Sequence, residues 1–363
     1  MKKRLLAVMM VLAMTASLVI GCGSKSGTDS SSGDSGESTE ADAENLKVAV
    51  VVNQKFGDNG PMDDLAAGAD RAAEDFGITV KKLESESAAK FEEDIRAMSA
   101  DYDLVVTTFP YMSDATVLVA GEYPDTKYTA IFQFINGDGT SIENIWDTEF
   151  HGEQAFYING YMAAKLSKTG KIGMVIGGEE PSPNAEGNGF MMGAKAANPD
   201  ITVECAYVGS YEDPAKAKEI ASAMIAKGCD FIQTDSGASN AGVVEACKDA
   251  GVLCAGEITD FYNTYDGFVG ITGIGFGDTL YKAVEMLVNK SWEGGEHGIR
   301  DLANGGYFMD WDSFERFADS NAEYGEEFKA IIEEGKEIEQ QIMDGSIEVP
   351  FDTDVADWSK FAE

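Results

Sequence analysis

The chain has 363 residues, of which 64 are acidic and 27 are basic, so its formal net charge at pH 7 is -37. This charge excludes nucleic acid as a partner, because phosphate backbones would be repelled. The only histidines, His151 and His297, show no metal-site spacing and no cysteine pair has zinc-ligand spacing, so the sequence predicts neither a metal site nor a cofactor.

The N-terminus has the pattern of a signal peptide over residues 1–21. Basic residues precede an apolar run from Leu5 to Ile20, which is too short for a comfortable membrane span. The run ends in Val-Ile-Gly-Cys, the order typical of a bacterial lipoprotein cleavage site, so we expect Cys22 to be acylated and to anchor the protein on the extracytoplasmic face of the cell membrane. The alternative is a cysteine that follows an uncleaved signal anchor.

Residues 22–45 are expected to form the lipidated cysteine and a disordered tether. After Cys22 this segment contains small, polar and acidic residues and no large apolar side chain, so it does not bury enough surface to offset its ordering entropy. The remaining chain is too long for one small core, which favours two lobes.

Strands and helices alternate from Leu46 onward, beginning with a strand at Lys47–Val52 and a helix at Pro61–Phe76. We expect the first lobe to contain residues 46–150 and, after a return of the chain, about 262–290. That return would bring in a strand at Phe268–Ile271 and a helix at Thr279–Val288.

The second lobe is expected at residues 151–261, with a tail of strands and a helix at 291–363 packing across the lobes. Its helix Ala215–Lys227 has a cap at Asp213 and a proline in its first turn. Strands joined by such helices run parallel, and small ligands bind at their carboxyl ends. Four cysteines are expected to be buried thiols in preference to a disulfide: Cys205, Cys229, Cys247 and Cys254.

Several long segments carry a resemblance: "LSKTGKIGMVIGG", "YVGSYEDPAKAKEIASAMIAKGCDFIQTDSG", "GVVEACKDAGVLCAGE" and "QQIMDGSIEVP". Together they resemble the basic membrane protein family of substrate-binding lipoproteins, over about Leu46 to Pro350. The resemblance implies an α/β, type I periplasmic-binding-protein fold with two doubly wound parallel-sheet lobes, a hinge and an interlobe cleft. It also implies a receptor for purine nucleosides that works with an ABC permease and its ATPase.

Site residues transfer from the family only where its motifs match. The first ligand loop reads Asp58-Asn59-Gly60-Pro61-Met62, so the acid is kept and an aromatic ring is lost. A second element reads Gly256-Glu257-Ile258-Thr259-Asp260, and the lysine expected in the following strand is missing. The Gly-Phe pair that ends in Phe190 is kept, and in relatives that ring lies against the ligand. Glu257 and Asp235 are candidates to replace the lost polar anchors.

Aromatic residues near strand ends are candidates for the lost stacking ring. Phe109 and Tyr111 follow the strand Leu104–Thr108, and Pro110 stiffens the loop between them. Each has an ordinary alternative as lobe packing, just as Asp58 and Asp260 have alternative roles as cap or turn residues. The predicted ligand-binding residues are Asp58, Asn59, Phe109, Tyr111, Phe190, Asp235, Glu257 and Asp260.

The sequence therefore favours a monomeric, tethered receptor that captures a small molecule by closure of its lobes. A purine nucleoside is the first ligand expected, and a flavin or a sugar-like solute is the alternative because the ribose anchors have changed. A ligand-sensing co-receptor or a tethered enzyme on the same fold also remains open. No motif for nucleophilic catalysis is visible, so the chain is not expected to be an enzyme.

Overall fold

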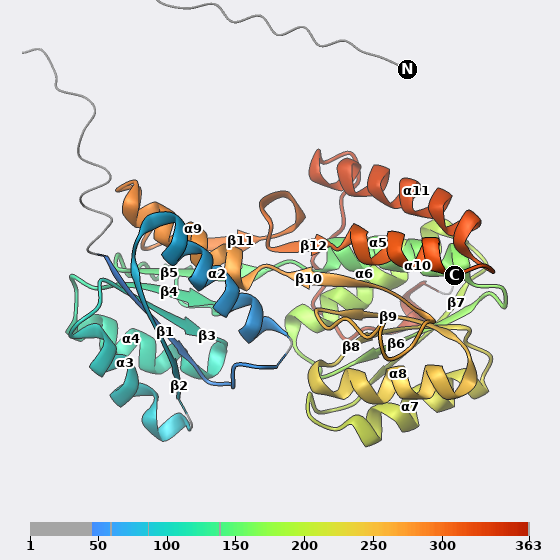
Figure 1. Cartoon of the computed structure of the whole chain (residues 1–363), viewed down its shortest axis with the longest axis horizontal. Helices are drawn as coiled ribbons and strands as arrows, with labels where there is room; N and C mark the ends of the chain where they lie inside the picture. The colour runs from blue at the N-terminus through green and yellow to red at the C-terminus, as the bar shows by residue number, and fades with distance from the viewer. Residues whose placement is uncertain (1–45, 59, 86, 138, 362–363) are drawn as a thin grey trace, which may run out of the picture. The chain divides into compact units, whose positions relative to one another are not determined.

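The computed structural model describes residues 46–58, 60–85, 87–137 and 139–361. Its strands form two six-stranded sheets, each covered by helices (Figure 1). The first sheet has the order β11-β5-β4-β3-β1-β2 and the second the order β12-β10-β9-β8-β6-β7. The strands are β1 (Lys47–Val52), β2 (Thr79–Glu84), β3 (Leu104–Thr108), β4 (Lys127–Ile131), β5 (Ile145–Phe150), β6 (Lys171–Ile176), β7 (Thr202–Tyr207), β8 (Phe231–Asp235), β9 (Leu253–Glu257), β10 (Phe268–Ile274), β11 (His297–Arg300) and β12 (Tyr307–Met309).

The first lobe is the first sheet with its four helices. Strand β1 is buried on both faces, as its unbroken apolar run requires in a parallel sheet: Val48 and Val50 join one core, and Ala49 and Val51 join another. Helices α2 and α9 pack together on the first face, and α3 and α4 pack together on the other. The helices are α2 (Pro61–Phe76), α3 (Phe91–Ser99), α4 (Ser113–Glu122) and α9 (Phe276–Val288).

The second lobe is the second sheet with its helices. Helices α5 and α6 cover the face of β6 that carries Ile172 and Met174, and α7 and α8 cover the face that carries Val175. The tail adds α10, which packs on β10, and α11, which packs on α10 and α5. These helices are α5 (Glu153–Leu166), α6 (Pro181–Ala197), α7 (Pro214–Ala226), α8 (Asn240–Ala250), α10 (Trp311–Ser320) and α11 (Gly325–Met343).

Helices α5 and α6 approach each other at backbone distance. A Cβ atom added to Gly160 would lie 1.9 Å from the carbonyl oxygen of Phe190, and one added to Gly193 would lie 1.8 Å from that of Tyr157. Because no larger residue fits at either position, this helix pair is packed backbone against backbone.

Among the described residues, three connections join the two lobes. They run from β5 to α5, from β10 to α9, and from β11 to β12. The domain prediction is wrong in one part: β10 was expected to return to the first lobe, but Phe268 pairs with Cys254 of β9 in the second sheet. The return therefore falls after Ile274, and only α9 and β11 belong to the first lobe. A strand's own pattern does not state which sheet it joins.

Two further expectations concern the N-terminal segment and the cysteines. The expected signal peptide, Cys22 and the tether lie outside the described residues. Within the described part, none of the helices is long and apolar enough to cross a bilayer. The four remaining cysteines are free thiols, buried except for the half-buried Cys205, as the sequence predicts.

Candidate functional site

The carboxyl ends of the parallel strands carry the candidate site. Each connection between the lobes starts at such an end, after Phe150 of β5, Ile274 of β10 and Arg300 of β11. The carboxyl edges of both sheets therefore lie on the side where the chain crosses between lobes, which is where open α/β sheets bind ligands.

The carboxyl edge of the first sheet borders a polar hollow at the ends of β1 and β2. The hydroxyl of Thr108 donates to Asn53 Oδ1 at 3.3 Å, and Glu84 accepts the backbone N–H of Phe56 at 2.9 Å. These contacts hold the Asn53 and Glu84 side chains in the lining of the hollow, which contains both hydrogen-bond donors and acceptors. The lining residues, none of which was predicted, are Asn53, Gln54, Lys55, Glu84 and Ser85.

Aromatic rings continue from this edge to the connections and form what we call the aromatic seam: Phe109, Phe132, Phe150, Phe276 and Tyr307. Phe276 lies 5.6 Å from Phe109 and 4.9 Å from Phe150, measured between ring centroids. Phe150 in turn lies 6.3 Å from Tyr307. Because Phe150, Phe276 and Tyr307 flank the three connections, the seam packs where the lobes are joined.

Backbone strain gathers at the same strand ends. The residues directly after β3, β4 and β9 are Phe109, Phe132 and Ile258, and their φ angles are 62°, 56° and 64°. Side chains other than glycine rarely adopt such angles, and each instance costs about 1–3 kcal/mol. Phe109 also has a ψ of 154°, a region that glycine otherwise dominates. Strain of this kind concentrates at binding sites.

At the carboxyl edge of the second sheet lie three acids that we call the carboxyl cluster. Asp235 ends β8, Glu257 ends β9, and Glu186 comes from the first half of α6. One oxygen from each acid lies within 4.8 Å of the other two. The Tyr307 hydroxyl lies 2.7 Å from Glu186 Oε1 and 3.2 Å from Glu257 Oε1, and the Ser182 hydroxyl lies 3.1 Å from Glu186 Oε1.

Burial raises the pKa of each acid in the carboxyl cluster. Glu257 reaches a pKa of about 7, because burial and the charge of Glu186 both disfavour its ionised form. The pKa of Glu186 is well above its ordinary value because of burial and then the charge of Asp235. For Asp235 the causes of the raised pKa are burial and then the charge of Glu257. Three carboxylates in this place need a proton or a cation beside them.

Tyr211 borders the carboxyl cluster and is not among the ligand-binding residues that the sequence predicts. A Cβ atom on Gly177, at the end of β6, would lie 2.2 Å from its ring, and the Tyr211 hydroxyl donates to Glu180. Burial, followed by the charge of Asp235, raises the pKa of Tyr211. Tyr211 is thus an aromatic ring beside the cluster, on a loop after β7.

Of the predicted residues in the first lobe, Asp58 caps a helix. Its carboxylate accepts the backbone N–H groups of Gly60 at 2.8 Å, and of Met62 and Asp63 at 3.2 Å, at the start of α2. Tyr111 is 75% exposed, and Phe109 belongs to the aromatic seam. Asn59 lies outside the described residues.

The prediction for Phe190 needs a correction. Its side chain is completely buried in the hydrophobic core, on the α6 turn that packs against Gly160. The glycine before it serves the same packing, because a Cβ atom on Gly189 would lie 2.3 Å from the carbonyl oxygen of Glu153. The Gly-Phe pair therefore holds α6 on α5 in this structure and offers no surface to a ligand.

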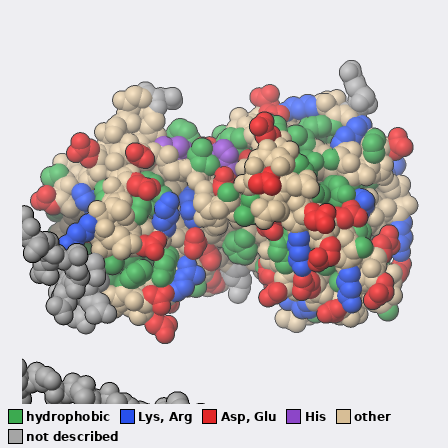
Figure 2. Space-filling view, turned by 90° about the horizontal axis from the view of Figure 1, so that it is seen from above, with side chains coloured by type: hydrophobic (Ala, Val, Ile, Leu, Met, Phe, Trp, Pro, Cys, Tyr) green, Lys and Arg blue, Asp and Glu red, His purple; other side chains and the backbone are tan. Residues whose placement is uncertain are grey.

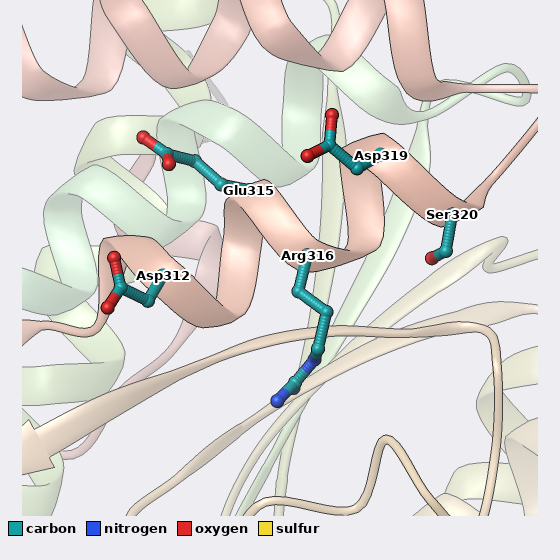
Figure 3. A pocket seen from close by; sticks show the side chains of 5 residues that line it. All are labelled: Asp312, Glu315, Arg316, Asp319 and Ser320. Atoms are coloured by element: carbon teal, nitrogen blue, oxygen red, sulfur yellow. The ribbon is translucent and has the colours of Figure 1, made fainter.

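Asp260 is occupied by an arginine. Arg316 donates to both of its carboxylate oxygens, at 2.8 and 2.9 Å, and stacks 4.3 Å from the ring centroid of Tyr262. Figure 3 shows Arg316 extending from α10 away from Glu315 and Asp319. The shallow hollow around these residues is an open helix surface, and the bidentate pair ties the loop after β9 to α10.

Both histidines meet at the first connection. His297 Nδ1 lies 2.6 Å from Asp147 Oδ2 and its Nε2 lies 3.3 Å from Glu149 Oε2. His151 Nε2 lies 3.5 Å from the same Glu149 oxygen, and His151 Nδ1 lies 3.4 Å from Glu153 Oε1. Figure 2, which views the molecule from above, shows histidine side chains at its surface. We call this group the histidine cluster; it joins β5 and β11 to the start of α5.

Comparison with known proteins settles the family. Residues 45–350 match the Bmp family model, described as ABC transporter substrate-binding protein PnrA-like. The chain belongs to this family. Its function in coarse terms, a substrate-binding protein of an ABC transporter, follows from that membership, and the resemblance predicted from the sequence is confirmed.

Relatives of known name are similar over much of the chain. Basic membrane protein B of Borreliella burgdorferi (strain ATCC 35210 / DSM 4680 / CIP 102532 / B31) is 29% identical over 298 residues, 78% of this chain and 84% of that protein. A purine-binding protein of Brucella abortus (strain 2308) is 32% identical over 226 residues, 60% of this chain and 61% of that protein. The match to basic membrane protein A of the same Borreliella strain, 30% identical, covers 56% of this chain and 60% of that relative.

Solved structures confirm the fold class. A solute-binding protein of an ABC transporter system from Aeropyrum pernix K1 has a TM-score of 0.69 at 24% identity, covering 85% of this chain and 94% of that one. Another, from Conexibacter woesei DSM 14684, has a TM-score of 0.67 at 21% identity, covering 84% and 98%. The two parallel-sheet α/β lobes are thus those of the type I periplasmic-binding-protein fold, as predicted.

Proposed function

We propose that this Bmp-family protein is an extracytoplasmic lipoprotein that captures a small, flat, hydroxyl-bearing solute, first of all a purine nucleoside, and delivers it to an ABC permease and ATPase. The observation that supports this most is the carboxyl cluster with Tyr307, at strand ends beside the connections between the lobes. The similarity to a purine-binding protein points the same way.

Energetics favour acids as the anchors of such a solute. A hydrogen bond to a charged group contributes about 1.5–3 kcal/mol, and stacking on one aromatic ring contributes about 1–3 kcal/mol. Micromolar affinity requires about 8 kcal/mol, so rings alone do not suffice. In the proposed complex Asp235 and Glu257 accept hydrogen bonds from the hydroxyls of the solute. Phe109 or Tyr211 contacts the flat face of the solute after the lobes close.

Native mass spectrometry of protein purified from cells without refolding tests the solute class. A co-purifying nucleoside supports the proposal, whereas a flavin or a sugar would replace the nucleoside and keep the receptor. Thermal melting with added nucleosides should then show a shift without consumption of the ligand. Turnover of the ligand, or no shift with any of these solutes, would contradict the proposal.

The anchoring part of the proposal has its own test. Cells fed a labelled fatty acid should label the wild-type chain but not a Cys22→Ala variant, because the acyl chains are attached through that thiol. The variant should also leave the membrane fraction. A Cys22→Ala chain that still carries label, or that remains in membranes as firmly as the wild type, would exclude Cys22 as the anchor.

A further inference from the structure

The acids of the carboxyl cluster lie in a place that favours a bound ion. Glu186 is 2% exposed, Asp235 is 4% exposed and Glu257 is 9% exposed, so water screens their charges poorly. Apart from the contacts that the three acids make with one another, the contacts that the structure gives to this cluster come from the neutral hydroxyls of Tyr307 and Ser182. These hydroxyls orient Glu186 but do not neutralise it.

An unpartnered atom is the second and separate sign of a ligand. Asp235 Oδ2 is buried and has no hydrogen-bond partner among the described residues. A buried polar atom left in this way costs about 1–3 kcal/mol, so native proteins normally supply a partner. The backbone of Asp235 is fixed, since its carbonyl oxygen accepts the N–H of Gly177 at 2.8 Å. The side chain of Asp235 contacts the carboxyls of Glu186 and Glu257, which can donate a hydrogen bond only when they are protonated.

The spacing of the three acids fits one hard cation. Calcium bonds to oxygen at about 2.3–2.6 Å, so two oxygens on opposite sides of one calcium ion are about 4.6–5.2 Å apart. The three ligand oxygens of the cluster already lie within 4.8 Å of one another. Carboxylates suit calcium, magnesium and manganese, and carboxylate ligands are usually held by hydrogen bonds such as those from Tyr307 and Ser182 to Glu186.

We propose that Glu186, Asp235 and Glu257 bind one divalent, oxygen-preferring cation of the calcium class at the carboxyl edge of the second sheet. The sequence predicts no metal site because the histidines and cysteines lack ligand spacing, and these three acids have no local pattern, being 49 and 22 residues apart along the chain. A second part rests on the proposed function: the cation takes one oxygen of each acid and coordinates solute hydroxyls, while Asp235 and Glu257 accept hydrogen bonds from the solute with their other oxygens, so cation and solute bind cooperatively.

Calorimetric titration of the full, chelator-treated chain with calcium chloride at physiological salt tests the first part without any solute. We expect one saturable site, with affinity at least tenfold weaker in Asp235→Asn and in Glu186→Gln. Glu245→Gln is the matched control, because Glu245 is an exposed acid of α8 that pairs with Lys218. Absence of a saturable site, or equal binding in all variants, would overturn the proposal and would indicate acids that share protons.

Terbium luminescence gives a second readout, in which the three acids that would bind the ion stay unchanged. A terbium ion in the cluster would lie close to the Tyr307 ring and be sensitised by it, so Tyr307→Phe should lower the emission at saturating terbium by at least half. Calcium should displace the ion and quench the signal. Emission unchanged by Tyr307→Phe would place the ion elsewhere.

The second part is tested by nucleoside titration with calcium and, separately, with chelator. Cooperative binding requires at least tenfold tighter nucleoside affinity with calcium. Equal affinity in both would refute cooperation while leaving the cation site and the receptor function in place. Calcium binding without nucleoside binding in either condition would remove the nucleoside proposal alone.

Discussion

The two sheets differ in one end strand, which is parallel in the first sheet (β11) and antiparallel in the second (β12), and their carboxyl edges differ in chemistry. The edge of the first sheet carries a mixture of neutral and charged polar groups, among them Asn53, Lys55 and Glu84, and aromatic rings such as Phe109, in a strained backbone. The edge of the second sheet carries three buried acids. The difference suggests a division of labour in which the first lobe supplies flat surfaces and the second supplies polar anchors.

The largest expected effect separates packing from binding in the second lobe. Phe190→Ala should lower the free energy of unfolding by about 3–5 kcal/mol, because it removes a completely buried ring from the hydrophobic core. Urea unfolding measures this loss, and the matched control Tyr111→Ala, at a 75% exposed ring, should stay within about 0.5 kcal/mol. A stable Phe190→Ala protein that has lost only its solute affinity would return Phe190 to the binding site.

The second prediction compares the two edges directly. Glu257→Gln should weaken solute binding by about 10- to 100-fold, because one charged acceptor contributes about 1.5–3 kcal/mol. Asn53→Ala, at the first edge, should cost about tenfold or less, since a neutral hydrogen bond contributes about 0.5–1.5 kcal/mol. Titration of the co-purifying solute measures both. A larger loss in Asn53→Ala would invert the division between the lobes.

How much of this was predictable differs between fold and site. Helix α7 was predicted because Asp213, Pro214 and Gly228 mark its ends locally. For α6 the sequence predicts a helix only around Gly189–Ala197, although the helix begins at Pro181, because its first half is rich in proline, asparagine and glycine, which are weak helix formers. Packing on α5 overrides that weak propensity, so the turn that carries Glu186 was missed.

The site residues show the same limit. Asp235 and Glu257 were predicted because each follows a buried strand run, and the carboxyl ends of parallel strands share one edge. Glu186 and Tyr307 come from a helix and from a short antiparallel strand, and only tertiary folding brings them within 2.7 Å. No local pattern indicates such a contact.

The third prediction concerns the histidine cluster, which joins the lobes. Burial acts to lower the pKa of His151, but contacts with Glu149 and Glu153 outweigh it and raise the pKa to about 9. Contacts with Asp147 and then Glu149 raise the pKa of His297 to about 9. Both folded values exceed the unfolded value of about 6.5. The stabilisation is thus complete below about pH 6.5 and is lost as the pH rises through about 9.

Urea unfolding across this pH range measures the effect, which we expect to be about 1–2 kcal/mol because the cluster is partly exposed. His297→Gln should flatten the loss between about pH 6.5 and 9. Glu149 has the opposite pH dependence. Burial acts to raise its pKa, but the two histidines outweigh burial and lower the pKa to about 2. Its contribution to the free energy of unfolding therefore falls as the pH drops from about 4.5 toward 2. A wild-type stability that is flat from pH 6.5 to 9 would show that the histidines add nothing.

The smallest effect tests whether the first lobe also holds a polar anchor. Asp58 and Asp213 both cap helices, and alanine at either position should cost about 1 kcal/mol of stability. Asp58 accepts three backbone N–H groups and Asp213 accepts one, so Asp58→Ala should cost the more of the two. Because these groups already occupy both oxygens of Asp58, solute affinity should change by less than about twofold in either variant, a shift of about 0.4 kcal/mol. A tenfold loss of affinity confined to Asp58→Ala would mean that the cap also binds the solute, and anchors would then come from both lobes.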